Sequence, residues 1–91
     1  MDIAIVGATG NVGRKTLEVL QQKNLNIDNL YLVASPNSAG KQLEYNGEKY
    51  SIENLETYDF SKAKITFFAA GGKISDQYGE KAAKHTTVID K

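Results

Sequence analysis

Apolar and polar positions alternate along this chain in blocks that predict both strands and helices. Apolar runs occupy residues 3–6, 30–34, 65–70 and 87–89, and each is short enough for a strand. The first three runs contain no turn residue, as is typical of parallel strands that are covered on both faces. We therefore predict four strands, of which the first three are buried.

Two other segments have the spacing of an amphipathic helix. In residues 11–23, the charged and amide side chains lie opposite an apolar stripe. The stripe consists of Val12, Thr16, Val19 and Leu20, with Leu17 beside it. Residues 75–84 form the second segment, in which Ile74, Tyr78 and Ala82 align.

The remaining segments carry turn and loop signals. Asn46-Gly47 separates two alternating segments, residues 41–45 and 48–52, which is the strongest short signal for a β-hairpin. Residues 53–64 hold apolar side chains at no clean period, so we predict a loop with a single helical turn. Residues 24–29 are polar and are predicted to form a loop that covers Leu25 and Ile27.

The order of these elements predicts an α/β fold: a Rossmann-like parallel sheet with two crossover helices and an inserted β-hairpin. Right-handed crossovers place the two helices on opposite faces if the chain changes sides of the first strand after the hairpin. A ligand crevice would then lie between a turn at Gly7 and a turn at Gly71-Gly72. Because two helices cannot cover both faces of such a sheet, we expect exposed apolar area on each face. Self-association as a homo-oligomer, or marginal stability, would follow.

Three glycines at a spacing of three follow the first apolar run: Gly7, Gly10 and Gly13. Gly7 would allow the sharp turn out of the strand, and Gly13 would let the first helical turn lie close to it. Gly10 would let the backbone approach a pyrophosphate without a Cβ between them. The N–H groups at the helix start would meet the anion, with Thr9 and Asn11 capping the helix or bonding phosphate oxygens. This order predicts a dinucleotide-binding domain, and the alternative is an ordinary strand-to-helix turn.

Length, charge and composition exclude several classes of function. At 91 residues the chain has room for one domain. Its 11 basic and 11 acidic residues balance, so neither nucleic acid nor an anionic membrane is indicated as a partner. No apolar run is long enough to span a bilayer and no signal peptide precedes the first strand, so we expect a cytoplasmic protein. The sequence has no cysteine, hence no disulfide and no thiol nucleophile, and we predict no metal site.

Four motifs together resemble the N-terminal part of aspartate-semialdehyde dehydrogenase. They are Gly-Ala-Thr-Gly-Asn-Val-Gly at residues 7–13, Ala-Ser-Pro-Asn-Ser-Ala-Gly-Lys at 34–41, Ala-Gly-Gly at 70–72 and Val-Ile-Asp at 88–90. The similarity runs over essentially the whole chain. It implies an NAD(P)-binding domain over residues 1–91, truncated before the catalytic and dimerisation domain. It also implies an NADP-dependent oxidoreductase that reduces β-aspartyl phosphate to aspartate semialdehyde, on the route to lysine, threonine and methionine.

The resemblance further implies which residues hold the cofactor. Thr9, Gly10, Asn11 and Val12 would hold the pyrophosphate, and Gly7 at the turn belongs to the same cofactor site. Ser35 and Ser38 would hold the 2′-phosphate, and Gly71 and Gly72 would approach the nicotinamide.

The residues themselves favour NADP over NAD. An NAD site has Asp or Glu at the end of the second strand to bond the ribose 2′-OH, whereas this chain has Ala34-Ser35 there. The side chains that could donate to a 2′-phosphate are Ser35, Asn37, Ser38 and Lys41. The family usually has Arg at the position of Asn37, so we expect Lys41 or Arg14 to substitute in part.

We predict no catalytic residue in this chain. The cysteine nucleophile, histidine base and phosphate-binding arginine of the family have no counterpart here, and His85 is expected to be a surface residue at a helix end. The chain is then the cofactor-binding part of an oxidoreductase, or alternatively a stand-alone nucleotide-binding or interaction module without enzyme activity. An extended short-chain enzyme is disfavoured, since its Tyr-x-x-x-Lys pair belongs on a helix whereas Tyr45 and Lys49 flank the hairpin turn.

Overall fold

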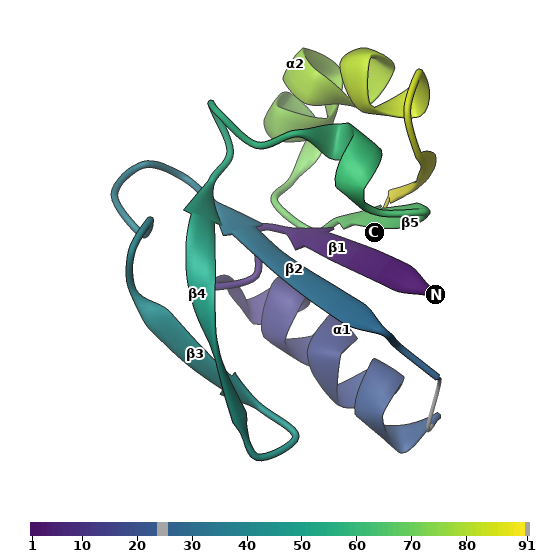
Figure 1. Cartoon of the computed structure of the whole chain (residues 1–91). Helices are drawn as coiled ribbons and strands as arrows, with labels where there is room; N and C mark the ends of the chain where they lie inside the picture. The colour runs from purple at the N-terminus through teal and green to yellow at the C-terminus, as the bar shows by residue number, and fades with distance from the viewer. Residues whose placement is uncertain (24–25, 91) are drawn as a thin grey trace.

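The strand that follows the N-terminal methionine, β1 (Asp2–Val6), lies in the interior of a six-stranded sheet (Figure 1). A computed structural model describes residues 1–23 and 26–90; the prediction for Leu25 lies outside these residues. The sheet has the strand order β3-β4-β2-β1-β5-β6. Its other strands are β2 (Asn29–Ala34), β3 (Gln42–Tyr45), β4 (Glu48–Asn54), β5 (Ile65–Phe68) and β6 (Thr87–Asp90). The four predicted strands are thereby confirmed, although the third ends at Phe68 because the next residues already bend toward the following turn.

β1 pairs in parallel with β2 on one side and with β5 on the other. Its residues 3–6 are at most 1% exposed, which explains the unbroken apolar run in the sequence. Alternate residues point to opposite faces, so Ile3 and Ile5 belong to one core cluster and Ala4 and Val6 to the other.

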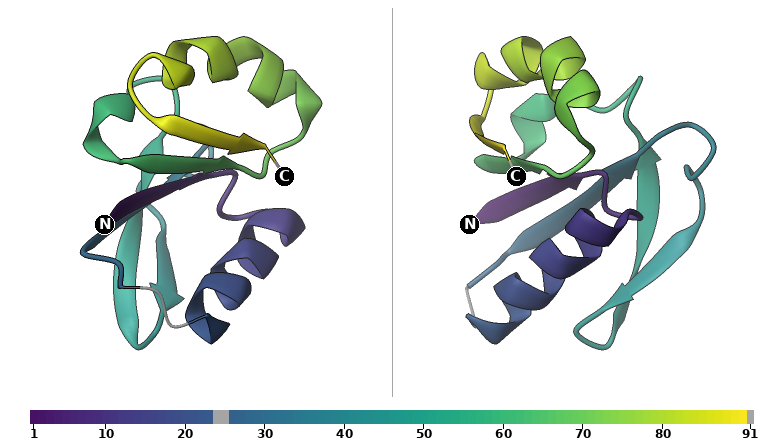
Figure 2. Two further views of the ribbon diagram at one scale, coloured as in Figure 1. Left: turned by 90° about the vertical axis from the view of Figure 1, so that its right-hand side faces the viewer. Right: turned by 180° about the vertical axis from the view of Figure 1, so that it is seen from behind.

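The two helices cover opposite faces of the sheet, as predicted (Figure 2). α1 (Asn11–Gln22) packs Leu17 and Leu20 on the face of Ile3 and Ile5, and we call this the α1 face. α2 (Gly72–Ala83) packs on the other face, the α2 face, with Ala82 fully buried. α2 begins three residues before the predicted start, because Gly71 already has the non-helical backbone conformation of the residue that caps the helix.

The predicted hairpin forms around Asn46 and Gly47, both of which have positive φ as a type I′ turn requires. It is not a separate unit. β4 also pairs in parallel with β2, with Leu32 opposite Ile52, so the hairpin continues the main sheet to its edge. The buried Ile52 explains this, because it adds an apolar side chain to the α1 face beside Leu32.

The segment between β4 and β5 was expected to be a loop with a helical turn, and it contains the short 3₁₀ helix η1 (Phe60–Lys62). This segment also covers part of the α2 face, as a helix would. Tyr58 and Phe60 are 5% and 2% exposed, and the Phe60 ring contacts the rings of Tyr58, Phe68 and Tyr78. The expectation of exposed apolar area on each face is therefore wrong for the α2 face. It is right for the α1 face, where Val12, Val19 and Ile89 are exposed.

Within the described ranges, neither helix has the length and apolar character needed to cross a membrane.

Candidate functional site

The site predicted from the glycine spacing is a tight turn between β1 and α1. Gly7 has φ +87°, and its N–H donates to the carbonyl of Val33 at 2.8 Å, so the turn is fixed to the neighbouring strand. A Cβ at Gly7 would lie 2.8 Å from the Cβ of Ala70. Both the backbone conformation and the close approach of the next strand's end therefore require glycine at residue 7.

Gly13 has a different reason to be glycine. It lies in the first turn of α1, where a Cβ would come within 2.1 Å of the Gly7 carbonyl oxygen and 2.8 Å of the Ala8 Cα. No real Cβ contact is that short, so only a hydrogen atom fits between helix and turn. The predicted close packing of the helix against the strand end is confirmed.

Gly10 is the N-cap of α1 and no side chain caps the helix, so the predicted capping by Thr9 or Asn11 is wrong. The turn is instead closed by its backbone: the Gly10 N–H donates to the Gly7 carbonyl at 3.1 Å, and the Arg14 N–H to the Gly10 carbonyl at 3.0 Å. Among the described residues, no acceptor is recorded for the N–H groups of residues 11–13. These donors and the positive end of the helix dipole suit an anion.

A Cβ at Gly10 would meet a single atom, the Gly7 carbonyl oxygen, at an ordinary 3.6 Å. Its φ is −82°, which any residue adopts. The folded chain itself therefore does not require glycine here, in contrast to Gly7 and Gly13.

A second glycine turn lies at the same edge of the sheet. Gly71, with φ +92°, is the N-cap of α2, and Gly72 is the first helical residue. Because β1 and β5 are adjacent and their helices cover opposite faces, the starts of α1 and α2 converge at the carboxyl ends of these strands. The first turn of neither helix carries an acidic residue. This is the predicted switch point, where open α/β sheets bind ligands.

A hollow of about 230 Å³ lies between the two turns. Its lining residues come from the ends of β1 and β2, the first glycine turn, the residues that follow β4 and β5, and the start of α2: Val6, Gly7, Thr9, Gly10, Ala34, Ser35, Leu55, Ala70 and Ile74. Pockets that enclose a drug-sized ligand have about 300–1,000 Å³. The hollow can hold the central part of a dinucleotide while both ends extend over the surface.

The structure brings together some of the predicted cofactor residues and leaves others outside the hollow. Those that line it are Gly7, Thr9, Gly10 and Ser35. Those at the starts of the two helices are Asn11, Val12, Gly71 and Gly72. Val12 is 49% exposed and its side chain lines a different groove, so it could bind an anion at the helix start only through its backbone N–H. Leu55 and Ile74 line the hollow without having been predicted, since nothing in an isolated apolar side chain signals a ligand.

The other predicted residues lie in the loop after β2. This loop is folded back on itself: the N–H groups of Ser38 and Ala39 donate to the Ser35 carbonyl at 2.9 and 3.2 Å. Asn37 and Lys41 are exposed and Ser38 is half-buried, so their polar groups face the surface beside Ser35. Arg14 instead lines a groove between α1 and β3.

The Tyr-x-x-x-Lys spacing of short-chain enzymes occurs at Tyr45–Lys49 and also at Tyr58–Lys62. Tyr45 and Lys49 lie on the two strands of the hairpin. Lys62 lies over the Tyr58 ring, 5.9 Å from its centroid, and its Nζ is 3.4 Å from Glu53 Oε1. Burial, together with the charge of Glu53, raises the pKa of the Tyr58 hydroxyl far above its ordinary value of 10.0. Neither pair lies on an α-helix or lines the hollow, so neither can act as a short-chain catalytic pair.

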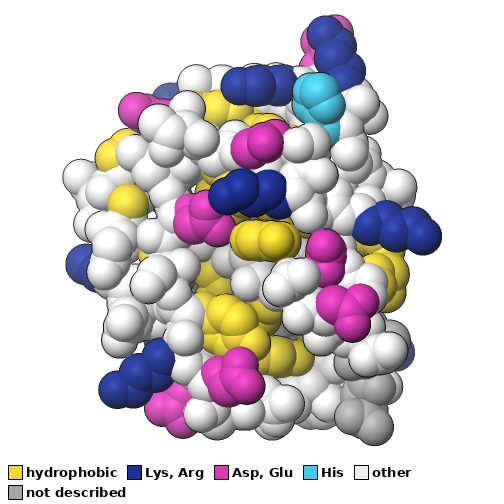
Figure 3. All heavy atoms as spheres, viewed as in Figure 1, with side chains coloured by type: hydrophobic (Ala, Val, Ile, Leu, Met, Phe, Trp, Pro, Cys, Tyr) yellow, Lys and Arg dark blue, Asp and Glu magenta, His cyan; other side chains and the backbone are white. Residues whose placement is uncertain are grey.

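His85 is exposed just beyond the C-terminal end of α2, as expected for a surface residue (Figure 3). Across residues 1–23 and 26–90, His, Cys, Asp and Glu side chains form no group of three that could hold a metal ion.

Comparison with known proteins identifies the family to which the chain belongs. The family described as "Semialdehyde dehydrogenase, NAD binding domain" matches residues 2–91 of this chain. The chain belongs to this family. The expected resemblance to aspartate-semialdehyde dehydrogenase is thereby confirmed, and residues 2–91 correspond to the family's dinucleotide-binding domain.

Individual proteins are similar to this chain in sequence or in structure. Aspartate-semialdehyde dehydrogenase of Rickettsia bellii is 43% identical over 91 residues, which is 99% of this chain and 27% of the relative. The USG-1 protein homolog of Azotobacter vinelandii is 42% identical over 82 residues, covering 90% of this chain and 24% of the relative. A crystal structure of aspartate semialdehyde dehydrogenase II from Vibrio cholerae, complexed with ASA, superposes with a TM-score of 0.92 at 42% identity, over 98% of this chain and 30% of that one. The chain thus spans about a quarter of the length of these curated relatives.

Proposed function

We propose that residues 1–91 bind NADP with its diphosphate at the start of α1, and that they bind it without turning it over. The observation that carries this proposal is the set of N–H donors at residues 11–13, which have no acceptor among the described residues, beside a residue 10 at which the fold does not require glycine. Anions bind at such helix starts because donors and dipole act together. Gly7, Thr9, Gly10, Asn11 and Val12 would surround the diphosphate.

The second glycine turn would serve the nicotinamide half of the cofactor. Gly71 and Gly72 directly follow Ala70, which lines the hollow, and a Cβ at either would contact no atom within 4 Å. A flat ring can therefore approach this backbone closely. The apolar side chain of Ile74, in the first turn of α2, supports the placement of a ring here rather than a second charged group.

The end of β2 supports a preference for NADP over NAD. Ser35 lines the hollow, and Asn37, Ser38 and Lys41 follow it in the exposed loop, so donors are available to a 2′-phosphate. The neighbouring strand contributes no competing carboxylate at this level. Ala34 lies opposite Asn54, whose Oδ1 accepts from the Glu56 N–H at 2.9 Å, and Glu53 is paired with Lys62.

In a protein of the relatives' length, this domain would supply the cofactor for the reduction of β-aspartyl phosphate to aspartate semialdehyde. Hydride would pass from NADPH to the acyl carbon and phosphate would leave, on the route to lysine, threonine and methionine. The present chain lacks the thiol for this chemistry, since it has no cysteine, and its one histidine is exposed beyond the C-terminal end of α2, whereas the hollow lies at the start of this helix. We therefore assign it cofactor binding alone.

Titration of the chain with NADPH and NADH, followed by nicotinamide fluorescence, tests the proposal. NADPH is expected to bind more tightly. Ser35→Asp should weaken the binding of NADPH and leave the affinity for NADH unchanged or higher, because a carboxylate repels the 2′-phosphate and accepts a hydrogen bond from a 2′-OH. Ser51→Asp, at an exposed position on β4, is the control and should leave the preference unaltered. Equal affinity of the unmodified chain for both cofactors would disprove the NADP preference, and binding of neither would disprove the site.

A further inference from the structure

The carboxyl end of β6 brings a negative charge to the second glycine turn. Asp90, which ends the Val-Ile-Asp motif, lies opposite Phe68 in the pairing of β5 with β6. Phe68 belongs to the core of the α2 face, and directly paired residues of parallel strands point to the same face, so Asp90 faces α2 as well. The hydroxyl of Ser75, at the end of the first turn of α2, donates to Asp90 Oδ1 at 3.1 Å. Figure 2 shows β6 ending beside the segment that leads from β5 into α2.

The Asp90 carboxylate is also close to the hollow. Ser75 directly follows Ile74, which lines the hollow from α2. Since neighbouring Cα atoms are about 3.8 Å apart, the hydrogen bond to Ser75 places the carboxylate within about 10 Å of this wall. Asp90 is exposed and takes part in neither ion pair of residues 1–23 and 26–90. Lys73, the nearest cation along α2, is exposed, does not line the hollow and forms neither of these ion pairs, so no ion pair neutralises the charge of Asp90.

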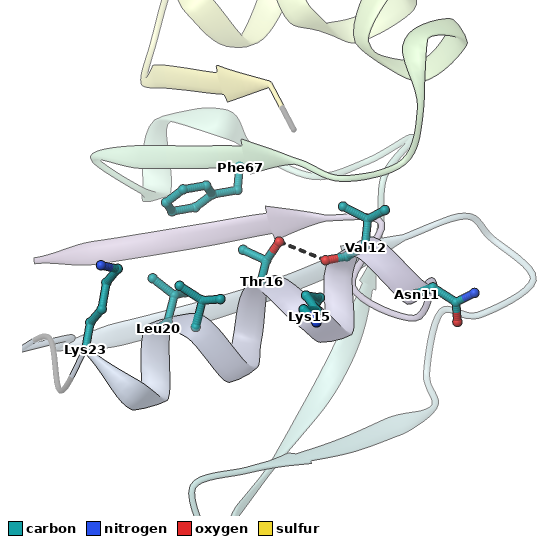
Figure 4. Close-up of a pocket in the computed structure, with 8 residues that line it drawn as sticks. Asn11, Val12, Lys15, Thr16, Leu20, Lys23 and Phe67 are labelled. Carbon is teal, nitrogen blue, oxygen red and sulfur yellow. Dashed lines mark hydrogen bonds between the residues drawn. The ribbon is translucent and has the colours of Figure 1, made fainter.

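The start of α1 has the opposite charge environment. Its first turn carries no acidic residue, and the basic residues Arg14 and Lys15 follow. Figure 4 shows Lys15 one turn after Asn11 on this helix. Basic side chains near a helix start favour an anion there, whereas a carboxylate beside the start of α2 repels one. The first glycine turn therefore suits the diphosphate, and the second suits a neutral or positively charged group.

The nicotinamide ring has one positive charge in NADP⁺ and none in NADPH, so a nearby carboxylate distinguishes the two. We propose that Asp90 favours the oxidised form of the cofactor, through the Coulomb attraction between its carboxylate and the ring at the second glycine turn. This inference rests on the dinucleotide binding proposed for residues 1–91. Ser75 is a positioning residue, since its hydroxyl holds the carboxylate toward the start of α2. Asp90 would then set which redox state of the cofactor the domain binds more tightly.

Asp90→Asn separates this effect of charge from a structural role. Asparagine keeps an oxygen that can accept from the Ser75 hydroxyl, but it removes the negative charge. At low ionic strength, the affinity for NADP⁺ should fall about twofold relative to the affinity for NADPH, as expected for one charge about 10 Å away in water. Nicotinamide fluorescence gives the affinity for NADPH, and displacement of NADPH gives the affinity for NADP⁺.

Two further variants sharpen the measurement. Ser75→Ala should change the ratio of the two affinities in the same direction but by less, because the carboxylate stays and only its position is released. Glu80→Gln removes the same charge from an exposed position farther along α2 and should leave the ratio as it is. In about 1 M NaCl, where the Debye length is about 3 Å, the effect of Asp90→Asn should disappear because Asp90 is exposed.

The outcomes distinguish this inference from the function on which it rests. An unchanged ratio in Asp90→Asn would overturn the role of the charge. An equal loss of affinity for both forms would also overturn it, and would assign Asp90 to the structure of the turn alone. An effect of the same size in Glu80→Gln would show that the charge of Asp90 has no special position. Binding of neither form by the unmodified chain would instead disprove the proposed function.

Discussion

The two glycine turns at the edge of the sheet have the same position in the fold but different physical reasons for their glycines. In the first turn, Gly7 and Gly13 are enclosed: a Cβ would lie 2.8 Å from Ala70 Cβ at one and 2.1 Å from a carbonyl oxygen at the other. In the second turn, a Cβ at Gly71 or Gly72 would meet nothing within 4 Å. Both turns have a glycine with positive φ, at Gly7 and at Gly71, but close packing excludes a Cβ only in the first turn.

This difference shows which glycines indicate a ligand-binding site and which are explained by the fold. Packing accounts for Gly13, and packing together with a positive φ accounts for Gly7, so both glycines would be expected in an ordinary strand-to-helix turn. Gly10 is the exception within the first turn, because neither its φ of −82° nor its surroundings demand glycine. The central claim of nucleotide binding therefore depends on Gly10 and the free N–H donors next to it.

The largest effect is expected from Gly13→Ala. The new Cβ would overlap the Gly7 carbonyl oxygen, which is backbone and cannot rotate away, so α1 must move off the strand. We expect the free energy of unfolding to fall by about 3 kcal/mol or more, as for severe overpacking. Urea unfolding measured by circular dichroism checks this. A loss below about 1 kcal/mol would show that the first turn is no more enclosed than the second.

Gly71→Ala should have an intermediate effect, because the cost comes from the backbone alone. Gly71 has φ 92° and ψ 167°, a region that is almost confined to glycine, and no atom opposes a Cβ. Such conformations cost about 1–3 kcal/mol for other residues. The same unfolding experiment should give a loss smaller than that of Gly13→Ala, and an equal or larger loss would break the distinction between the two turns.

Gly79→Ala is the smallest change and should have the opposite sign. Gly79 lies in the interior of α2, away from both turns, and a Cβ there contacts nothing within 4 Å. Alanine should raise the free energy of unfolding by about 0.5–1 kcal/mol through its helix propensity. A destabilised Gly79→Ala variant would mean that open space around a glycine does not predict tolerance in this chain.

Much of the fold could be predicted from sequence because its signals are local. The apolar runs of β1, β2 and β5, the Asn46-Gly47 turn and the periodicity of α1 each depend on residues within one element. The role of residues 55–60 could not be predicted, because Tyr58 packs against Tyr31 and Phe60 packs against Tyr78, and both partners are distant in sequence. The exposure of Val12 and Val19 was missed for a related reason. Periodicity identifies an apolar stripe, but it does not show how much of the stripe a sheet will cover.

The site was predicted in part for similar reasons. Gly7, Gly10 and Ser35 could be identified because backbone freedom and the end of β2 have sequence signals, and they line the hollow. Capping by Thr9 or Asn11 was wrong, since the choice of N-cap depends on where the turn closes, and here the Gly10 N–H bonds the Gly7 carbonyl. The position of Arg14 beside β3 depends on how the hairpin joins the sheet, which no local pattern encodes.

The most direct test of nucleotide binding at the first glycine turn is a comparison of Gly10→Ala with Gly79→Ala by NADPH titration and urea unfolding. Gly10→Ala should remain folded, with a stability cost of no more than about 1 kcal/mol because alanine is a poor N-cap. Its affinity for NADPH should nevertheless fall at least about tenfold, since a methyl group would stand between the backbone donors and the diphosphate, whereas Gly79→Ala should bind as the unmodified chain does. Unchanged NADPH affinity in a folded Gly10→Ala variant would contradict the account.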